Sequence, residues 1–132
     1  MTKEQRLKKR LRSKADKLWF NLYLKERCEV CGSTDGLQGH HFYYKKSYPH
    51  LRYDPDNHIT LCKRCHFLLH HQDPKRIENK IIEKRGKRWY NKLTKKAQKQ
   101  YSLETISLQT IEWYKENIER MTKEYDQQRK KN

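Results

Sequence analysis

The residue types that bind metals are concentrated in one stretch of the chain: all four cysteines and six of the seven histidines lie within residues 28–70. The cysteines form two C-x-x-C pairs, Cys28 with Cys31 and Cys62 with Cys65. Two such pairs supply the four thiolates that a structural zinc ion prefers in tetrahedral geometry. Disulfide bonds, a redox pair and unligated cysteines are the alternatives.

The first residues of the chain help to choose among these alternatives. Residues 1–10 are strongly charged and no long apolar run follows them, so nothing here resembles a signal peptide. A reducing compartment such as the cytoplasm keeps thiols free to bind metal. We therefore expect a cytoplasmic protein in which the four cysteines bind a structural Zn²⁺.

The spacing between the two cysteine pairs predicts a second metal site. Thirty residues lie between Cys31 and Cys62, whereas ordinary zinc ribbons place about 15–20 residues there. This insert contains His40, and two more histidines, His66 and His70, follow four residues apart. A spacing of four places both side chains on one face of a helix. His40, His66 and His70 are thus candidates to hold a second metal ion.

The joint pattern C-x2-C, H-H, N, C-x2-C-H-x3-H resembles the HNH endonucleases, which have the ββα-metal fold. This resemblance implies that His40 is a metal ligand and that His41 is the general base. It implies further that Asn57 buttresses the loop orienting the base, and that His66 and His70 complete the metal site. Small phage and mobile-element proteins of this family have a similar look.

The resemblance implies a chemistry as well, the hydrolysis of DNA phosphodiesters to 5′-phosphate and 3′-hydroxyl ends by nicking or double-strand cleavage. Neutral imidazole, with an ordinary pKa of about 6.5, suits His41 to removing a proton from water. Asn57 or a backbone carbonyl would hold the other ring nitrogen. The family suggests Mg²⁺ or Mn²⁺ as the catalytic divalent metal, while three imidazoles also suit Zn²⁺ or Ni²⁺.

Two other functions compete with this interpretation. One is a non-catalytic zinc module that binds DNA or RNA, and the other is a nuclease that cleaves RNA, since nothing in the sequence selects the deoxy sugar. The remaining histidines, His50, His58 and His71, have no family role, and we assign them to loop surface, strand face and helix end.

Composition agrees with a small domain that binds a polyanion. The 132 residues are 36% charged and 33% hydrophobic, and the formal net charge is +16. So small a core indicates that zinc is needed to hold the fold, and the charge indicates duplex or branched DNA, or RNA, as partner. No apolar run of about 18 residues is present, so we expect no membrane span.

We expect an α+β, α-rich fold in three parts. Residues 1–27 read as a basic amphipathic helix with ten lysines and arginines, whose first ten residues would order only on DNA. Residues 28–72 would form the zinc-stapled ββα-metal (HNH) core, with strands over 37–44 and 58–61 and a helix over 63–71. Residues 73–132 would form a basic helical extension.

Within this extension, Asp73 and Pro74 signal a helix start, and Gly86 would interrupt the helix before residue 100. A last helix, capped by Ser102, would carry an apolar stripe that includes Leu103, Ile106, Ile111, Tyr114, Ile118 and Met121. This stripe would pair with the preceding helix as a hairpin or with a second copy of the chain as a dimer.

Several basic residues are candidate contacts for DNA phosphates. They lie in or beside the histidine-containing segment and around the glycine that interrupts the extension. These candidates are Arg52, Lys63, Arg64, Lys84, Arg85, Lys87 and Arg88. Trp89, which follows them, is more typical of a residue that anchors its helix than of one that stacks on bases.

Overall fold

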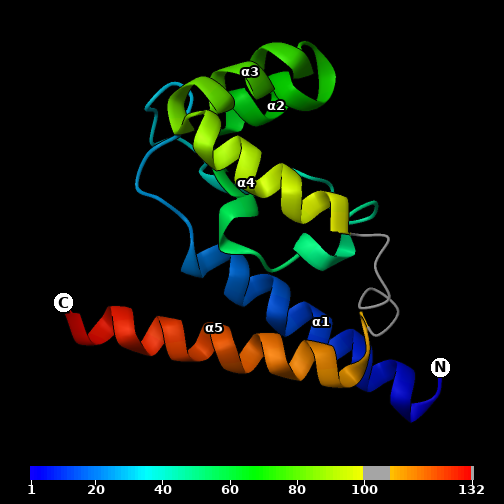
Figure 1. Ribbon diagram of the computed structural model, residues 1–132. Coiled ribbons are helices and arrows are strands. Elements are labelled where there is room, and N and C mark those ends of the chain that lie inside the picture. Colours follow the sequence, from blue (N-terminus) through cyan, green and yellow to red (C-terminus); the bar gives the residue numbers. More distant parts are fainter. Residues whose placement is uncertain (100–107, 132) are drawn as a thin grey trace.

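The computed structural model describes residues 1–99 and 108–131 of the chain, so the expected cap Ser102 and the stripe residues Leu103 and Ile106 lie outside it. Two long helices lie side by side at one end of the molecule, and three shorter helices gather at the other (Figure 1). The elements are α1 (Lys3–Leu22), β1 (Gln38–His41), η1 (Pro49–Leu51), η2 (Pro55–Asn57), β2 (His58–Leu61), α2 (Lys63–His71), α3 (Pro74–Arg85), α4 (Lys87–Gln98) and α5 (Ile111–Lys131).

The ββα unit forms as expected from the sequence. β1 and β2 pair antiparallel, with Gln38 opposite Leu61 and His41 opposite His58. The helix α2 follows at once, and Cys62 caps it because its sulfur accepts a hydrogen bond from the backbone N–H of Cys65. β1 is shorter than expected.

The helix α3 begins and ends where the sequence predicts, at the Asp73–Pro74 start signal and at Gly86. The Asp73 side chain accepts a hydrogen bond from the Arg76 N–H at the start of α3, with Pro74 in the first turn. Gly86, at φ +96°, then separates α3 from α4. Apolar side chains of β2, α2 and α3 pack with three of the four cysteines as one core cluster. Its buried members include Ile59, Leu61, Leu69, Ile77 and Ile81.

The helix α5 packs against α1, which differs from the expected hairpin with the preceding helix. Tyr114 and Met121 of α5 lie in one buried cluster with Ala15 and Trp19 of α1. Both helices are amphipathic, and each covers the apolar face of the other. The stripe expected to form a hairpin or a dimer is therefore largely used within the chain.

The helix α1 also begins earlier than expected. Thr2 caps it with a reciprocal pair of hydrogen bonds to Gln5, and the helix starts at Lys3. Among the residues that the structure describes, no helix is both long and apolar enough to cross a membrane.

Candidate active site and metal centres

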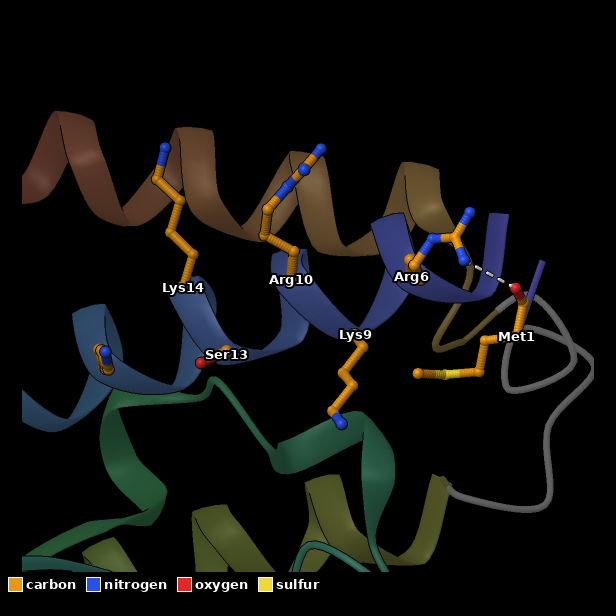
Figure 2. Close-up of a pocket in the computed structure, with 7 residues that line it drawn as sticks. Met1, Arg6, Lys9, Arg10, Ser13 and Lys14 are labelled. Atoms are coloured by element: carbon orange, nitrogen blue, oxygen red, sulfur yellow. Dashed lines mark hydrogen bonds between the residues drawn. The ribbon is translucent and has the colours of Figure 1, made fainter. Parts of the chain in front are cut away.

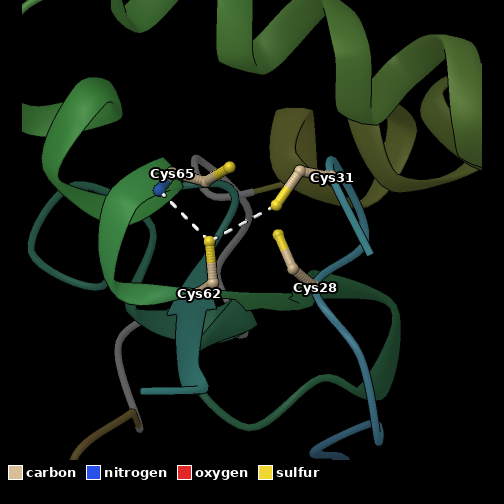
Figure 3. A group of neighbouring side chains, drawn as sticks. All are labelled: Cys28, Cys31, Cys62 and Cys65. Atoms are coloured by element: carbon tan, nitrogen blue, oxygen red, sulfur yellow. Dashed lines mark hydrogen bonds between the residues drawn. The ribbon is translucent and has the colours of Figure 1, made fainter. Parts of the chain in front are cut away.

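The four cysteine sulfurs converge on one point between the two C-x-x-C turns (Figure 3). All four Sγ atoms lie within 4.8 Å of one another, and those of Cys31 and Cys62 are 3.5 Å apart. Cys28, Cys62 and Cys65 are buried and Cys31 is exposed. Four converging free thiols are the donor set of a structural zinc site, so the arrangement fits Zn²⁺.

Backbone N–H groups prepare these sulfurs for metal binding. The Val30 N–H donates to Cys28 Sγ at 3.4 Å, and the Cys65 N–H donates to Cys62 Sγ at the same distance. Burial alone would raise the pKa of Cys28, but nearby backbone donors lower it to about 7. The Cys28 thiolate, which is the form that binds zinc, is thus accessible at neutral pH, whereas burial raises the pKa of Cys31 and of Cys65.

A second cluster joins His40 of β1 to His66 and His70 of α2. One ring nitrogen from each lies within 4.8 Å of the others, and the Nε2 atoms of His66 and His70 are 3.1 Å apart. Burial and the neighbouring imidazoles lower the pKa of His40 to about 3, so its ring is neutral at pH 7. Three converging imidazoles are a ligand set that fits a divalent transition metal ion.

His41, the next residue of β1, is held by the backbone carbonyl of Arg52. The His41 Nε2 atom lies 2.9 Å from this oxygen. Since a carbonyl oxygen only accepts hydrogen bonds, Nε2 carries the hydrogen and Nδ1 keeps a lone pair. Burial is the main cause that lowers the pKa of His41 to about 4, so the ring is neutral at pH 7. His41 thus presents an unprotonated nitrogen, Nδ1, at neutral pH.

Asn57 holds the loop between β1 and η1. Its side chain is fully buried, accepts from the Tyr43 N–H at 2.8 Å, and donates to the carbonyls of Tyr43 and Leu51 at 3.1 Å. Leu51 precedes Arg52, whose carbonyl holds His41. Of the two expected partners for His41, the structure therefore shows the backbone carbonyl, and Asn57 acts on the loop.

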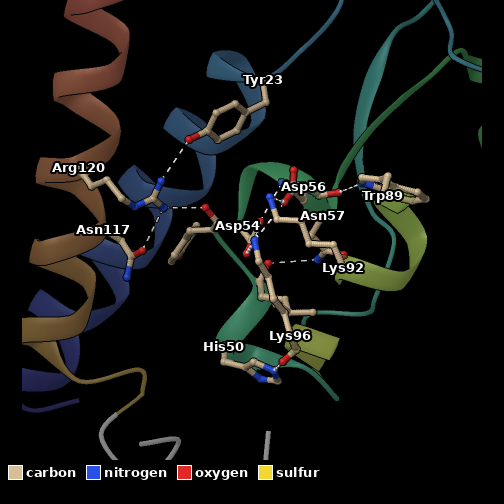
Figure 4. Close-up of polar contacts among 12 residues, drawn as sticks. Tyr23, His50, Asp54, Asp56, Asn57, Trp89, Lys92, Lys96, Asn117 and Arg120 are labelled. Atoms are coloured by element: carbon tan, nitrogen blue, oxygen red, sulfur yellow. Dashed lines mark hydrogen bonds and ion pairs between the residues drawn. The ribbon is translucent and has the colours of Figure 1, made fainter. Parts of the chain in front are cut away.

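The helix α4 anchors the segment that carries Asn57 (Figure 4). The Lys96 ammonium lies 3.0 Å from carboxylate oxygens of both Asp54 and Asp56, and the Trp89 indole donates to the Asp56 carbonyl at 2.8 Å. Burial alone would raise the pKa of Asp56, but Lys96 and a second lysine lower it. Trp89 is thus an anchor, as its sequence context suggested.

Two of the expected DNA contacts have other partners. The Arg52 guanidinium binds the Asp16 carboxylate through two hydrogen bonds of 2.8 and 2.7 Å. Arg85 binds Glu29 in the same two-fold manner, at 2.7 and 2.9 Å. Their side chains are only 11% and 15% exposed, so both arginines stabilise the fold and we no longer expect them to contact phosphates. The other candidates are exposed, namely Lys63, Arg64, Lys84, Lys87 and Arg88.

Sequence reasoning missed Trp19 of α1, which packs on the candidate base. Its ring stacks on the His41 ring with centroids 4.0 Å apart and planes 9° from parallel. Its only sequence signal was a place on the apolar face of α1.

His58 lies inside the fold, with Nε2 3.1 Å from the Phe20 carbonyl, and His50 contacts the Lys96 carbonyl.

Two surface hollows are lined by cations. The first, of about 550 Å³, lies along α1, with Arg6, Arg10 and Lys14 projecting from one side of the helix (Figure 2). The second, of about 330 Å³, lies beside the cysteine cluster. Its described lining has an apolar floor and four cations, Arg64, Arg76, Lys80 and Lys84.

A two-stranded antiparallel sheet followed by a helix, with a histidine pair on the first strand and two histidines on the helix, defines a ββα-metal unit. Residues 28–79 match the family model of the HNH endonucleases, and the four cysteines in this stretch fit the zinc-binding variant. This match supports a nuclease in general. No curated protein and no solved structure matches the chain.

Proposed function

We propose that the protein is a metal-dependent HNH endonuclease that hydrolyses phosphodiester bonds in duplex or branched DNA and leaves 5′-phosphate and 3′-hydroxyl ends. The observation that carries this proposal is the geometry of His41. One of its nitrogens is fixed on a backbone carbonyl and the other is unprotonated, next to a cluster of three histidines. A purely structural zinc module has no use for this arrangement.

In this proposal His41 takes a proton from the attacking water through Nδ1. The Arg52 carbonyl keeps the ring in the required tautomer, and Asn57 keeps that carbonyl's loop in place. His40, His66 and His70 would hold a divalent cation, either Mg²⁺ or Mn²⁺ or else Zn²⁺ or Ni²⁺. When bound, this ion supplies charge stabilisation to the phosphate and to the leaving 3′ oxygen.

The zinc site and the exposed cations would support DNA cleavage in different ways. Zinc on the four cysteines would fix the turns that place β1 and α2 relative to each other. The exposed cations Lys63, Arg64, Lys84, Lys87 and Arg88 would contact DNA phosphates.

Both cationic hollows offer further places for the DNA backbone. The hollow along α1 and the hollow beside the cysteines are each lined by four or more lysines and arginines. Such contacts fix position on the duplex without reading sequence, so we propose that sequence specificity is limited.

Conversion of supercoiled plasmid to nicked circles in Mg²⁺ or Mn²⁺ tests the proposal. Wild type should nick the plasmid, and His41→Ala should lower the rate by about 100-fold or more. The matched control is His71→Ala, an exposed histidine at the end of α2, which should nick at close to the wild-type rate. Zinc content and circular dichroism show that each variant is folded.

Matched RNA substrates in the same assay separate the two alternatives. Cleavage of RNA in preference to DNA would reassign the substrate. If wild type and His41→Ala were equally inert on duplex, branched and single-stranded DNA and on RNA, while still binding with a steep salt dependence, the protein would be a zinc-containing binding module.

A further inference from the structure

The helix α1 lies outside the residues that match the HNH family, yet it supplies a direct partner of the candidate base. Trp19 is 2% exposed and its ring stacks in parallel on that of His41. The Trp19 indole N–H donates to the Asp54 carbonyl at 3.1 Å, which fixes the position of the indole itself. The plane of the His41 ring is thus set by an indole ring whose own position is fixed by a hydrogen bond and by burial.

A second contact from α1 reaches the same base through Arg52. Asp16, one helical turn before Trp19, binds the Arg52 guanidinium through both carboxylate oxygens. It also accepts a hydrogen bond from the Tyr53 hydroxyl at 2.8 Å. Because the Arg52 carbonyl accepts from His41 Nε2, holding residues 52 and 53 holds the acceptor of the base.

The helix α5 keeps α1 in place. Arg120 of α5 donates to the Tyr53 carbonyl at 2.7 Å and to the Tyr23 hydroxyl at 3.2 Å (Figure 4). Tyr23 also donates to Glu124 of α5. Together with the buried cluster shared by the two helices, these contacts hold α1 and the segment around Tyr53 against α5.

We propose that Trp19 and Asp16 are positioning residues of the nuclease, and that α1, held by α5, completes the active site that the ββα unit alone leaves unfinished. This inference rests on the proposed role of His41 as general base. Trp19 sets the plane of the His41 ring, and Asp16 sets the carbonyl that fixes its tautomer.

The expected effect is on the rate of the chemical step. A general base works only when its lone pair points at the proton to be removed, and a displacement of about 1 Å can cost about 100-fold in rate. Without Trp19 the ring loses the surface that fixes its plane, although it keeps its hydrogen bond to Arg52. Substrate binding depends on exposed cations elsewhere, so KM should change little.

Steady-state plasmid nicking by the full-length chain tests this inference. Trp19→Leu should lower kcat by about 10- to 100-fold with KM within about twofold of wild type, and Trp19→Phe, which restores a flat ring, should recover most of the loss. The matched control is Trp113→Leu. Trp113 packs against the same apolar cluster and contacts Tyr53 and Tyr114, so its loss should lower stability and leave kcat unchanged.

Asp16→Ala provides a second route, since the Asp16 side chain is 37% exposed and is not itself a member of the buried apolar cluster. It should lower kcat by several-fold or more, again with little change in KM. If wild type nicks DNA and His41→Ala does not, but folded Trp19→Phe, Trp19→Leu and Asp16→Ala all keep the wild-type kcat, α1 has no positioning role. An inactive wild type would instead contradict the proposed function itself.

Discussion

Replacing Arg85 by methionine should lower the free energy of unfolding of the zinc-bound protein while leaving its electrostatic attraction to DNA unchanged. In the sequence, Arg85 is one of four cations around Gly86 and resembles its neighbours. In the structure it holds three parts of the fold together. Its guanidinium binds Glu29 through two hydrogen bonds and donates to the His58 carbonyl at 2.6 Å.

The magnitude follows from the burial of this ion pair. The side chains of Arg85 and Glu29 are 15% and 8% exposed, and removing one partner of a buried pair costs about 3–5 kcal/mol. Glu29 keeps a hydrogen bond from the Thr60 N–H and an ion pair with Lys25. We therefore expect the lower end of the range, about 3 kcal/mol.

Urea denaturation, followed by circular dichroism, measures the stability, and DNA binding over a series of salt concentrations measures the electrostatic contacts. The matched control is Arg88→Met, which removes the same group from an exposed position in α4, three residues along the chain. This control should change stability by less than about 0.5 kcal/mol and lower the salt slope of binding by about one. Arg85→Met should lower the stability by about 3 kcal/mol and leave the salt slope of binding unchanged.

An Arg85→Met protein within about 1 kcal/mol of wild type would refute the assignment of Arg85 to the fold. The same conclusion would follow if its salt slope fell as that of Arg88→Met does, because a residue inside the fold releases no counterions when DNA binds.

Three further predictions concern the zinc site, the loop that carries Asn57 and the contact between α1 and the sheet. Cys62→Ser should lose about one zinc ion per chain and much of the folded signal in circular dichroism, and retention of both would argue against a structural zinc. Lys96→Met should cost about 1 kcal/mol between about pH 4 and pH 10. The ion pair lowers the pKa of Asp56 and raises that of Lys96. The stability difference from wild type in urea denaturation should therefore vanish at low pH, as the folded protein's Asp56 becomes protonated, and at high pH, as its Lys96 loses its proton. A difference that does not depend on pH would contradict this origin. Gly39→Ala should cost about 1–3 kcal/mol in the same assay, because the new Cβ would lie 2.6 Å from Nε2 of His58, and a stability equal to that of wild type would show that this contact relaxes freely.

The sequence predicts those features that depend on short spacings. The two C-x-x-C turns, the helix that carries His66 and His70, and the helix start at Pro74 all follow from residues a few positions apart. In each case ligand geometry or helix capping allows few alternatives, so the residue types nearly determine the local structure.

The features that escaped prediction join residues far apart in the chain. Arg85 and Glu29 are separated by 56 positions, and Arg52 and Asp16 by 36. In a chain so rich in lysine and arginine, composition cannot tell a buried arginine from a solvated one. The contact of α5 with α1 was missed for a similar reason, because an apolar stripe shows that a helix needs a partner without showing which one.

The order of the helices along the chain bears on how the protein is made. α1 and the ββα unit leave the ribosome well before α5, which follows them in the sequence. The four cysteines and the histidines His40, His66 and His70 are all present by residue 70, so a nascent chain would already contain both candidate metal sites. If α5 is what seats Trp19 on His41, the ability to cut would come only once α5 has also been made.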